Sequence, residues 1–548
     1  MQGRRGLYAA LLVAAVFAVY ARSVFAEFVW DDEHFVRSNL TLASWHTLPR
    51  IFLESTTSGA GLKSDFYRPS QSITHFFDLH LWGADPRGHH LTNVLLQAAT
   101  TLAVFFWLST LAPLEGALAA AALWALHPLQ VEAVAYISGR GDILAVFFLC
   151  AGLALSGRSL ILTFCCAVLG LLSKESLVTF PALLFLHDRA LSRPLRWPRY
   201  VPFAALLIVY VTLRLTLLNF HDLLNFNGFQ SVLTEHKISR LFTYLPTLPE
   251  GLRLWLWPSD LHHDRAWQIY ASLATPRVWL SALFVAAWLG AAAFFWKRNR
   301  TVSVGLLWFI VATAPTSNLV ILVNSLFFDH WFLLPGLGLA LVLAQVPILT
   351  SRTRPYAIGA TLLLCAACGT VSQKLIDTWH DPVAFNTYLR TYEPHNTRVL
   401  ANLAGALAER GGLGDSEESI SIWREAIATE DHPGFHAGLA RVLESQGDLS
   451  GADTEYRSAV QMDPRYHEGW IALAMFESKN GNHEGARQAA ERDLLLFPKR
   501  AEAYLVLAQM ALEQGDTARA LAQLQHGIEQ VEDPRLRAGL EKVRARLK

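Results

Sequence analysis

Apolar stretches separated by short polar joins run from Leu7 to about Val371, and a charged, Ala/Leu-rich pattern follows from Gln373 to Lys548. An α-helix needs about 20 apolar residues to cross a hydrocarbon core. Together with flanking polar residues, these stretches predict eleven membrane spans. They are Leu7–Phe25, His90–Leu111, Gly116–Tyr136, Ile143–Leu155, Leu160–Leu172, Leu177–Leu186, Tyr200–Leu218, Trp279–Trp296, Val302–Ile321, Trp331–Leu349 and Tyr356–Val371. The pattern predicts an all-α protein with a membrane domain over 1–373 and a second domain over 374–548.

The stretch Ile238–Pro258 is apolar overall but contains Arg240, Glu250 and Arg253. A charge at mid-bilayer costs about 2.5–3.5 kcal/mol on insertion scales, so we interpret this stretch as an interfacial or re-entrant helix. Eleven spans with the N-terminus inside keep the basic join Lys297–Arg300 on the inner side, as the positive-inside rule requires. The second domain then lies outside. We expect the first span to be retained, with removal as a signal peptide as the alternative.

Glycines recur every 34 residues in the second domain, at Gly447, Gly481 and Gly515. This is the period of tetratricopeptide repeats, in which each unit is a pair of antiparallel helices. Small residues at matching positions, such as Ala452, Ala486 and Ala520, let paired helices approach closely. We therefore predict an α-solenoid of tetratricopeptide repeats, with a looser first unit between Asn396 and Pro433 and a polar capping helix at the end.

Composition narrows the possible functions further. The formal net charge is zero, so no bulk field attracts nucleic acid. All five cysteines lie in apolar stretches, where thiols usually behave as small hydrophobes. We therefore predict neither disulfides nor a redox site, although Cys365 and Cys368 have CxxC spacing.

Ionisable residues gather at the joins that this topology places outside. Asp31 and Asp32 follow the first span, and Arg68 lies further along the same loop. The other outer-face candidates are His127, Glu132, Arg140, Asp142, Lys174, Glu175, Arg265, Asp329 and His330. Ionisable groups near a span are a functional hypothesis by default. Paired carboxylates beside cations suit sugar transfer from a polyprenyl phosphate, because a carboxylate can deprotonate the acceptor hydroxyl and Arg or Lys can hold the departing phosphate.

Several short motifs follow one another in a specific order. They are Phe28-Val-Trp-Asp31-Asp32 with Asn39, Tyr67-Arg68-Pro69, Gly88-His-His-Leu-Thr-Asn93, His127-Pro128 through Glu132, Gly139-Arg140-Gly-Asp142, Lys174-Glu175, Pro258 through Asp264, Ala314-Pro315-Thr316-Ser317-Asn318 and Trp379-His-Asp381. In this order the chain resembles the tetratricopeptide-repeat and transmembrane O-mannosyltransferases of the GT-C superfamily over essentially its whole length.

The resemblance implies an inverting glycosyltransferase that moves a mannose-like or other hexose from a polyprenyl phosphate to Ser or Thr of exported proteins. It makes Asp31 and Asp32 the catalytic candidates and the remaining outer-face residues the binding site for the donor. Asp329-His330 stands where the family usually has Glu-Arg, so the donor headgroup can differ. The repeats would bind the acceptor protein, and no cofactor is implied. We expect a prokaryotic relative in a bacterial inner membrane, or an endoplasmic-reticulum protein if eukaryotic.

Each candidate also has a structural interpretation. Asp31-Asp32 can cap a helix, Arg68 can anchor the chain to lipid headgroups, and His127 can cap or pack. Arg140-Asp142 and Lys174-Glu175 can be ion pairs that close helix ends. His262-His263-Asp264 has metal-binding residue types, but adjacent ligands rarely chelate one ion, so no metal is predicted. Asn39-Leu-Thr41 matches a glycosylation acceptor.

Two other classes of function compete with the transferase. A ligase or polymerase of lipid-linked oligosaccharides can carry such repeats, but that class tends to place its basic residues in a late outer loop. A non-enzymatic scaffold or a transporter is the second alternative. A transporter should show internal repeats among its spans and polar residues at mid-membrane, whereas here the polar residues lie at one face.

Overall fold

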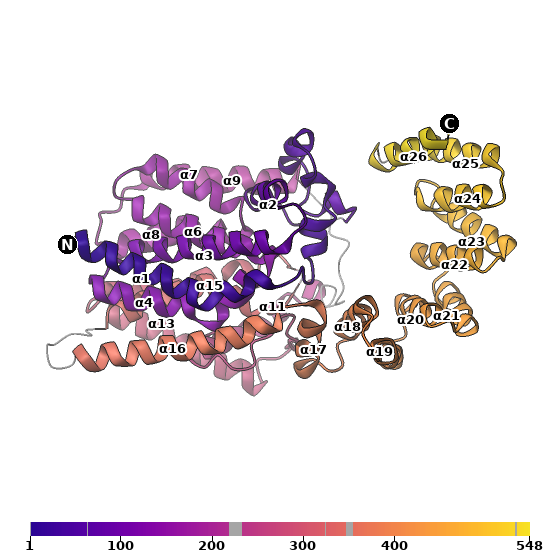
Figure 1. The fold of residues 1–548 in the computed structure, drawn as a ribbon. Helices are drawn as coiled ribbons and strands as arrows, with labels where there is room; N and C mark the ends of the chain where they lie inside the picture. Colours follow the sequence, from indigo (N-terminus) through magenta and orange to yellow (C-terminus); the bar gives the residue numbers. More distant parts are fainter. Residues whose placement is uncertain are drawn as a thin grey trace. The chain divides into compact units, whose positions relative to one another are not determined.

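The structure, a computed structural model, describes residues 2–62, 64–218, 233–323, 325–346, 354–531 and 534–547. Every element assigned in these ranges is helical. The chain divides into two compact units, Met1–Tyr388 and Leu389–Lys548. The first unit is a bundle of apolar helices, and the second is a series of short paired helices (Figure 1).

Five helices of the first unit are long and apolar enough to cross a membrane. They are Gly3–Phe25, which includes most of α1 (Gln2–Tyr20), Pro86–Leu108 (α3), Ile137–Leu155, which includes α6 (Arg140–Leu155), Pro276–Trp296 (α13), and Pro355–Thr378 within α16 (Arg354–Thr378). Each coincides with a predicted span. The chain is therefore a multi-pass membrane protein.

Shorter apolar helices coincide with four more predicted spans. They are α7 (Leu160–Leu171), α9 (Val201–Leu215), α14 (Arg300–Ala312) and α15 (Leu333–Ala344). Helix α8 (Phe180–Ala190) overlaps a further one. By length and composition the described residues support five spans, or six if a bent helix pair is one span, so the number eleven stays a prediction.

The bent pair replaces the straight helix that we predicted over Gly116–Tyr136. Helix α4 (Leu114–Leu126) and the segment Pro128–Ala135 meet at an angle of 55°. The break lies at His127, whose ψ of 137° is extended, because a residue that precedes proline is disfavoured in the helical region. The bend leads into α5 (Val131–Ala135), which carries Glu132.

The first unit is packed around α3, which lies against α1, α4 and α6 (Figure 1). Large aromatic side chains fill the spaces between the helices: Trp107 of α3 and Trp308 of α14 are fully buried, with ring centroids 5.1 Å apart. The indole of Trp124 on α4 donates to the carbonyl of Leu333 at the start of α15, at 3.4 Å. The Trp124 contact joins the end of α4, just before His127, to the start of α15, just after Asp329 and His330.

The stretch Ile238–Pro258 forms two short helices, α11 (Lys237–Tyr244) and α12 (Thr247–Leu256). With 8 and 10 residues, neither is long enough to cross a membrane. Arg253 on α12 is paired with Glu250 at 2.7 Å and with Asp260 at 3.0 Å. The structure thus agrees with excluding this stretch from the spans.

The second unit consists of consecutive antiparallel helix pairs. In chain order they are α18 (Thr397–Arg410) and α19 (Asp415–Thr429), α20 (Pro433–Ser445) and α21 (Leu449–Met462), α22 (His467–Lys479) and α23 (His483–Leu496), and α24 (Glu502–Glu513) and α25 (Thr517–Gln530), followed by α26 (Pro534–Leu547). The predicted pairs and their period are confirmed.

The periodic glycines end the first helix of each of the last three pairs. Gly447, Gly481 and Gly515 have φ values of +82°, +80° and +78°, a left-handed conformation that only glycine adopts without cost. Ala486 and Ala520, which we predicted at close helix contacts, are fully buried. The repeat register read from the sequence therefore matches the packing.

Candidate functional site

Asp32 is fully buried and its carboxylate is fully engaged. Its Oδ1 accepts hydrogen bonds from the amide and hydroxyl of Ser138, at 2.8 and 2.6 Å, and its Oδ2 accepts from the amide of Val29 at 3.1 Å. Burial raises the pKa of Asp32 to about 7, although these hydrogen bonds act in the opposite direction. Asp32 therefore ties the loop after α1 to the turn Ile137–Gly139 that precedes α6.

Asp31 is only half-buried. Its carbonyl accepts hydrogen bonds from the amides of His34 and Phe35, at 2.9 Å each, and so begins the π-helical turn Glu33–Arg37. Its carboxylate is close enough to His263 to contribute to that residue's titration. Of the predicted catalytic pair, Asp31 is therefore the less buried residue.

Glu132 lies between two histidines from distant parts of the chain. The Nδ1 atoms of His263 and His330 are each 2.6 Å from Oε1 of Glu132. Burial acts to lower the pKa of His263, but the charge of Glu132 outweighs it, with Asp264 and Asp31 as smaller contributors, so this pKa is raised. The structure thus gathers Glu132, His330 and Asp31 around His263, a residue that the sequence analysis did not select for the donor site.

Aromatic rings surround His263. They are Trp30 at 5.2 Å between centroids, Phe328 at 5.0 Å, Trp379 at 6.0 Å, Tyr136 at 6.1 Å and Phe385 at 6.2 Å. They come from five separate segments of the first unit. Aromatic faces and edges bind both cations and sugar rings, so the arrangement suits a polar ligand that is partly shielded from water.

Backbone strain also gathers at this place. Among the described residues, five that are not glycine have positive φ, and three of them are Trp30, Asp260 and Asp264. Each costs about 1–3 kcal/mol, and such residues persist mainly where a site needs an unusual geometry. Because they lie close to His263 in the chain or in space, this cluster is the candidate functional site.

Arg265 and Asp329 form an ion pair next to the residues around His263. The Nε of Arg265 donates to Oδ1 of Asp329 at 3.0 Å, and its Nη1 donates to Asp260 at 3.0 Å. The amide of His262 donates to the other oxygen of Asp329, also at 3.0 Å. This network holds the 260–265 loop against the turn Asp329–Phe332 and thereby places His263 beside His330.

Arg68, Glu175, Lys174 and Asp142 form a separate group. Nε of Arg68 donates to Glu175 at 3.0 Å, and Lys174 pairs with Asp142 at 2.5 Å. Burial acts to raise the pKa of Glu175, but Arg68 lowers it overall. The ion pairs therefore join different segments, and the partners are not the sequence neighbours that we considered.

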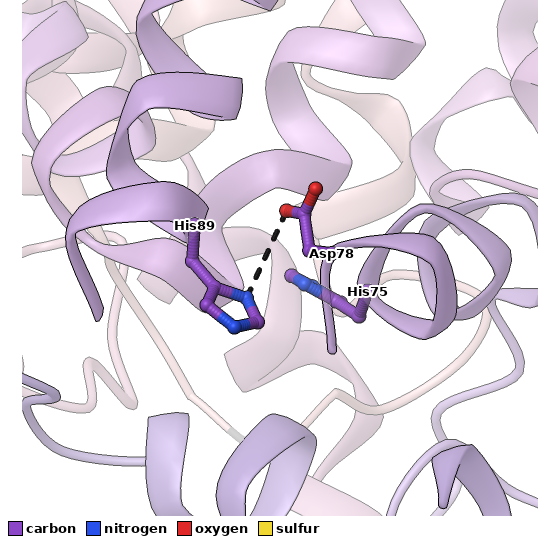
Figure 2. Close-up of side chains that lie close together, drawn as sticks. All are labelled: His75, Asp78 and His89. Carbon is purple, nitrogen blue, oxygen red and sulfur yellow. Dashed lines mark ion pairs between the residues drawn. The ribbon is translucent and has the colours of Figure 1, made fainter. Parts of the chain in front are cut away.

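Arg140 is fully buried and belongs to a third group (Figure 2). Its Nη2 lies 2.6 Å from Asp78 on α2 (Pro69–Trp82), and its Nε donates to Asn93 at 2.6 Å. His75 and His89 flank Asp78, and Nδ1 of His89 lies 3.7 Å from the same carboxylate (Figure 2). Burial lowers the pKa of His75 well below its usual value.

His127 acts within the bend between α4 and α5. Its Nδ1 accepts from the amide of Leu129 at 3.2 Å, and its Nε2 donates to the carbonyl of Trp255 at 3.1 Å. The imidazole also stacks on Trp255, with ring centroids 4.2 Å apart. Both ring nitrogens of His127 therefore form hydrogen bonds within the protein, which favours its interpretation as a capping or packing residue.

Comparison with known proteins gives independent information about the relatives of this chain. No family model matches the chain. The chain is 24% identical to a protein O-mannosyl-transferase of Caenorhabditis elegans over 85% of this chain and 64% of the relative. It is 33% identical to protein O-mannosyl-transferase Tmtc1 of Drosophila melanogaster over 32% of this chain and 22% of the relative. It is 21% identical to protein O-mannosyl-transferase TMTC3 of Homo sapiens over 93% and 62%, respectively.

The fold and the site define a multi-pass membrane protein with a helical repeat unit. Its homologues are the protein O-mannosyl-transferases of the TMTC type, and the chain spans less than two thirds of the length of the relatives just described. Among solved structures, it resembles the tetratricopeptide-repeat protein YrrB (14% identity, covering 35% of this chain and 98% of YrrB) and yeast Tom70 (12%, covering 74% and 88%). Their TM-scores are 0.24 and 0.26, so the repeat assignment depends on this chain's own period and helix pairs.

Proposed function

We propose that this chain is a membrane glycosyltransferase that transfers a hexose, mannose or a similar one, from a polyprenyl phosphate to a hydroxyl of an exported protein. The activity named for its homologues supports the transfer to protein. The observation that carries the proposal is the setting of Asp31: a half-buried acidic residue beside a strained, aromatic-lined group of ionisable residues.

Asp31 is the proposed general base. As the acceptor oxygen forms its bond to C1 of the sugar, the carboxylate takes the hydroxyl proton, and the bond between C1 and the phosphate oxygen breaks. The polyprenyl phosphate leaves with the bonding electron pair, and C1 is inverted. Asp32, whose oxygens accept three hydrogen bonds, positions Asp31 instead of reacting.

The donor phosphate needs positive charge where the leaving group develops its negative charge. Arg68 is a proposed contact, because a guanidinium has five N–H donors and its Nε is the one directed at Glu175. Arg265, Lys174 and His330 are further candidates from the outer-face set. Arg140 and His127 are assigned a structural role, because they are hydrogen-bonded inside the bundle and are more deeply buried than Arg265, Lys174 and His330.

The acceptor is proposed to bind through the repeat unit, which would lie on the same outer side of the membrane as Asp31. Tetratricopeptide arrays offer extended surfaces for peptide segments. The membrane domain 1–373 would then carry the chemistry, and the repeats in 374–548 would select the protein.

The experiment compares purified Asp31→Asn with the parent for transfer from a labelled polyprenyl-phosphate sugar. The substitution keeps size and hydrogen bonding but removes the base, so turnover should fall by about 10²–10⁴-fold while donor binding persists. Glu33→Gln is the matched control, because Glu33 is a neighbouring acid that pairs only with Arg37 on the surface. If Asp31→Asn transfers the sugar at the parental rate, Asp31 is not the base, and the ligase and scaffold alternatives are favoured.

A further inference from the structure

Three side chains from separate segments converge on one point in the first unit. Glu132 comes from α5, His263 from the loop after α12, and His330 from the turn Asp329–Phe332. One ligand atom from each lies within 4.8 Å of the other two. Their side chains are only 8–14% exposed. The geometry points to a binding site for one divalent transition-metal ion at Glu132, His263 and His330.

The residue types favour a particular class of ion. Imidazole nitrogens suit Zn²⁺ and related transition metals, whereas Mg²⁺ and Ca²⁺ prefer oxygen ligands. Two histidines and one glutamate also match catalytic zinc sites, which use three protein ligands and keep a fourth position open. Metal–ligand bonds of about 2.0–2.1 Å in a tetrahedral site place ligand atoms about 3.3 Å apart. The two 2.6 Å contacts at Glu132 therefore need to open by less than about 1 Å.

The charges around the three residues favour a cation. Asp31 and Asp264 both act on His263 electrostatically in addition to Glu132. Two nearby cations are already paired with carboxylates: Arg265 with Asp329 and Asp260, and Arg253 with Glu250 and Asp260. Carboxylates therefore predominate close to the three residues, which suits a bound cation.

The second histidine–carboxylate group of the described residues makes an instructive comparison. His75, Asp78 and His89 are also close enough for one ion and are more deeply buried (Figure 2). However, the guanidinium of Arg140 lies 2.6 Å from Asp78. It already neutralises this carboxylate, and a second cation beside it would be repelled in a poorly solvated place. This comparison assigns the ion to Glu132, His263 and His330.

The ion would bind the phosphate of the donor, a role that rests on the proposed function. A divalent cation with an open coordination position stabilises the negative charge that grows on a departing phosphate. Asp31 is close enough to His263 to act on it electrostatically. One site would then hold the leaving group while the adjacent carboxylate accepts the proton.

The test uses the full-length protein in detergent, stripped with a chelator and titrated with Zn²⁺, with metal content measured by mass spectrometry. We expect about one bound ion per chain in the parent, and binding at least about 100-fold weaker in His263→Gln and His330→Gln. His262→Gln is the matched control and should bind like the parent, because His262 is the adjacent residue and its Nδ1 is hydrogen-bonded to the Asp260 carbonyl at 2.7 Å instead of to Glu132. Co²⁺ binding, read from its visible absorption, gives a second measurement in any variant that folds poorly.

The outcomes separate the site from its role. A parent that binds no ion, or equal binding by all three variants, overturns the metal site. If an ion binds but its removal leaves donor binding and transfer unchanged, the link to the donor phosphate is overturned and the metal site itself stands. An ion that binds as expected in a protein that transfers no sugar overturns the proposed function alone.

Discussion

Asp32 and Ser138, 106 positions apart in the chain, are joined twice, since both the amide and the hydroxyl of Ser138 donate to Oδ1 of Asp32. This double contact fastens the loop that carries Asp31 to the end of a candidate span. The loop is thus held by a side chain that is itself out of reach of solvent.

Removing the hydroxyl in Ser138→Ala should destabilise the protein by about 1.5–3 kcal/mol, because a hydrogen bond to a buried carboxylate is lost. Transfer should fall only through misplacement of Asp31, so it should fall much less than in Asp31→Asn. Thermal unfolding and sugar transfer, measured on the same preparations, show whether stability falls more than activity does. Ser44→Ala, which removes a half-buried hydroxyl that caps the turn Trp45–Phe52 and does not contact Asp32, is the control. A loss of activity as large as that of Asp31→Asn without a loss of stability would assign the chemistry to Asp32 instead.

The topology can be tested without any assay of activity. We expect a reporter fused after Lys548 to be active only on the outer side of the membrane, because an odd number of spans separates it from the N-terminus. A cysteine introduced as Arg298→Cys, at an exposed position after α13, should resist a membrane-impermeant label applied from outside. Reporter activity in the cytoplasm would contradict the orientation and the placement of Asp31.

The repeat unit should fold without the membrane domain, because its cores are formed between neighbouring repeats. We expect Leu389–Lys548 to be soluble and helical. Ala486→Asp would bury a carboxylate at a fully buried position and should lower the free energy of unfolding by at least about 3 kcal/mol. Ala518→Asp, at an exposed position in the first turn of α25, should have little effect. Circular dichroism during urea unfolding distinguishes the two, and equal stabilities would mean that the repeat register is wrong.

The stability of the same unit should depend on pH through His467. Burial acts to lower the pKa of His467, but Asp493, at 2.6 Å, and Glu502 raise it to about 9. The folded state therefore binds its proton more tightly than the unfolded state does. This stabilisation is complete below the unfolded pKa of about 6.5 and is lost as the pH rises through about 9. Melting temperatures of the isolated unit between pH 6 and 10 should fall, and His467→Gln should flatten that part of the profile. An unchanged slope in the variant would show that another group is responsible.

The sequence predicted well what depends on local spacing. The glycines at Gly447, Gly481 and Gly515 specify turns by their own conformational freedom, so the repeat register could be predicted without tertiary information. The sequence was less informative about which charged side chains form ion pairs with each other. Arg140 and Asp142 are two positions apart, and side chains at that spacing on a helix do not face each other. They pair instead with Asp78 and Lys174.

The group around His263 shows why the rest could not be predicted. Glu132 is 131 positions from His263 and 198 from His330, and only the packing of the helices brings them together. A signal was present in the sequence, because Glu132 lies near the end of a predicted span and the two histidines lie in polar joins, all on the side that the predicted topology places outside. Asn39 shows the reverse, a sequence motif that the structure explains differently. Its side chain is buried and donates to the carbonyls of Phe35 and Thr56, so the amide of this glycosylation motif has a structural role.

The identical left-handed glycine turns in the second unit make the repeat array modular. Because each turn is complete within its own helix pair, a whole repeat can be inserted or deleted by recombination without remodelling the turns that remain. The membrane unit and its ionisable cluster are untouched by such an event. Under the proposed function, the range of acceptor proteins can therefore diversify in steps of one repeat, independently of the chemistry of the membrane unit.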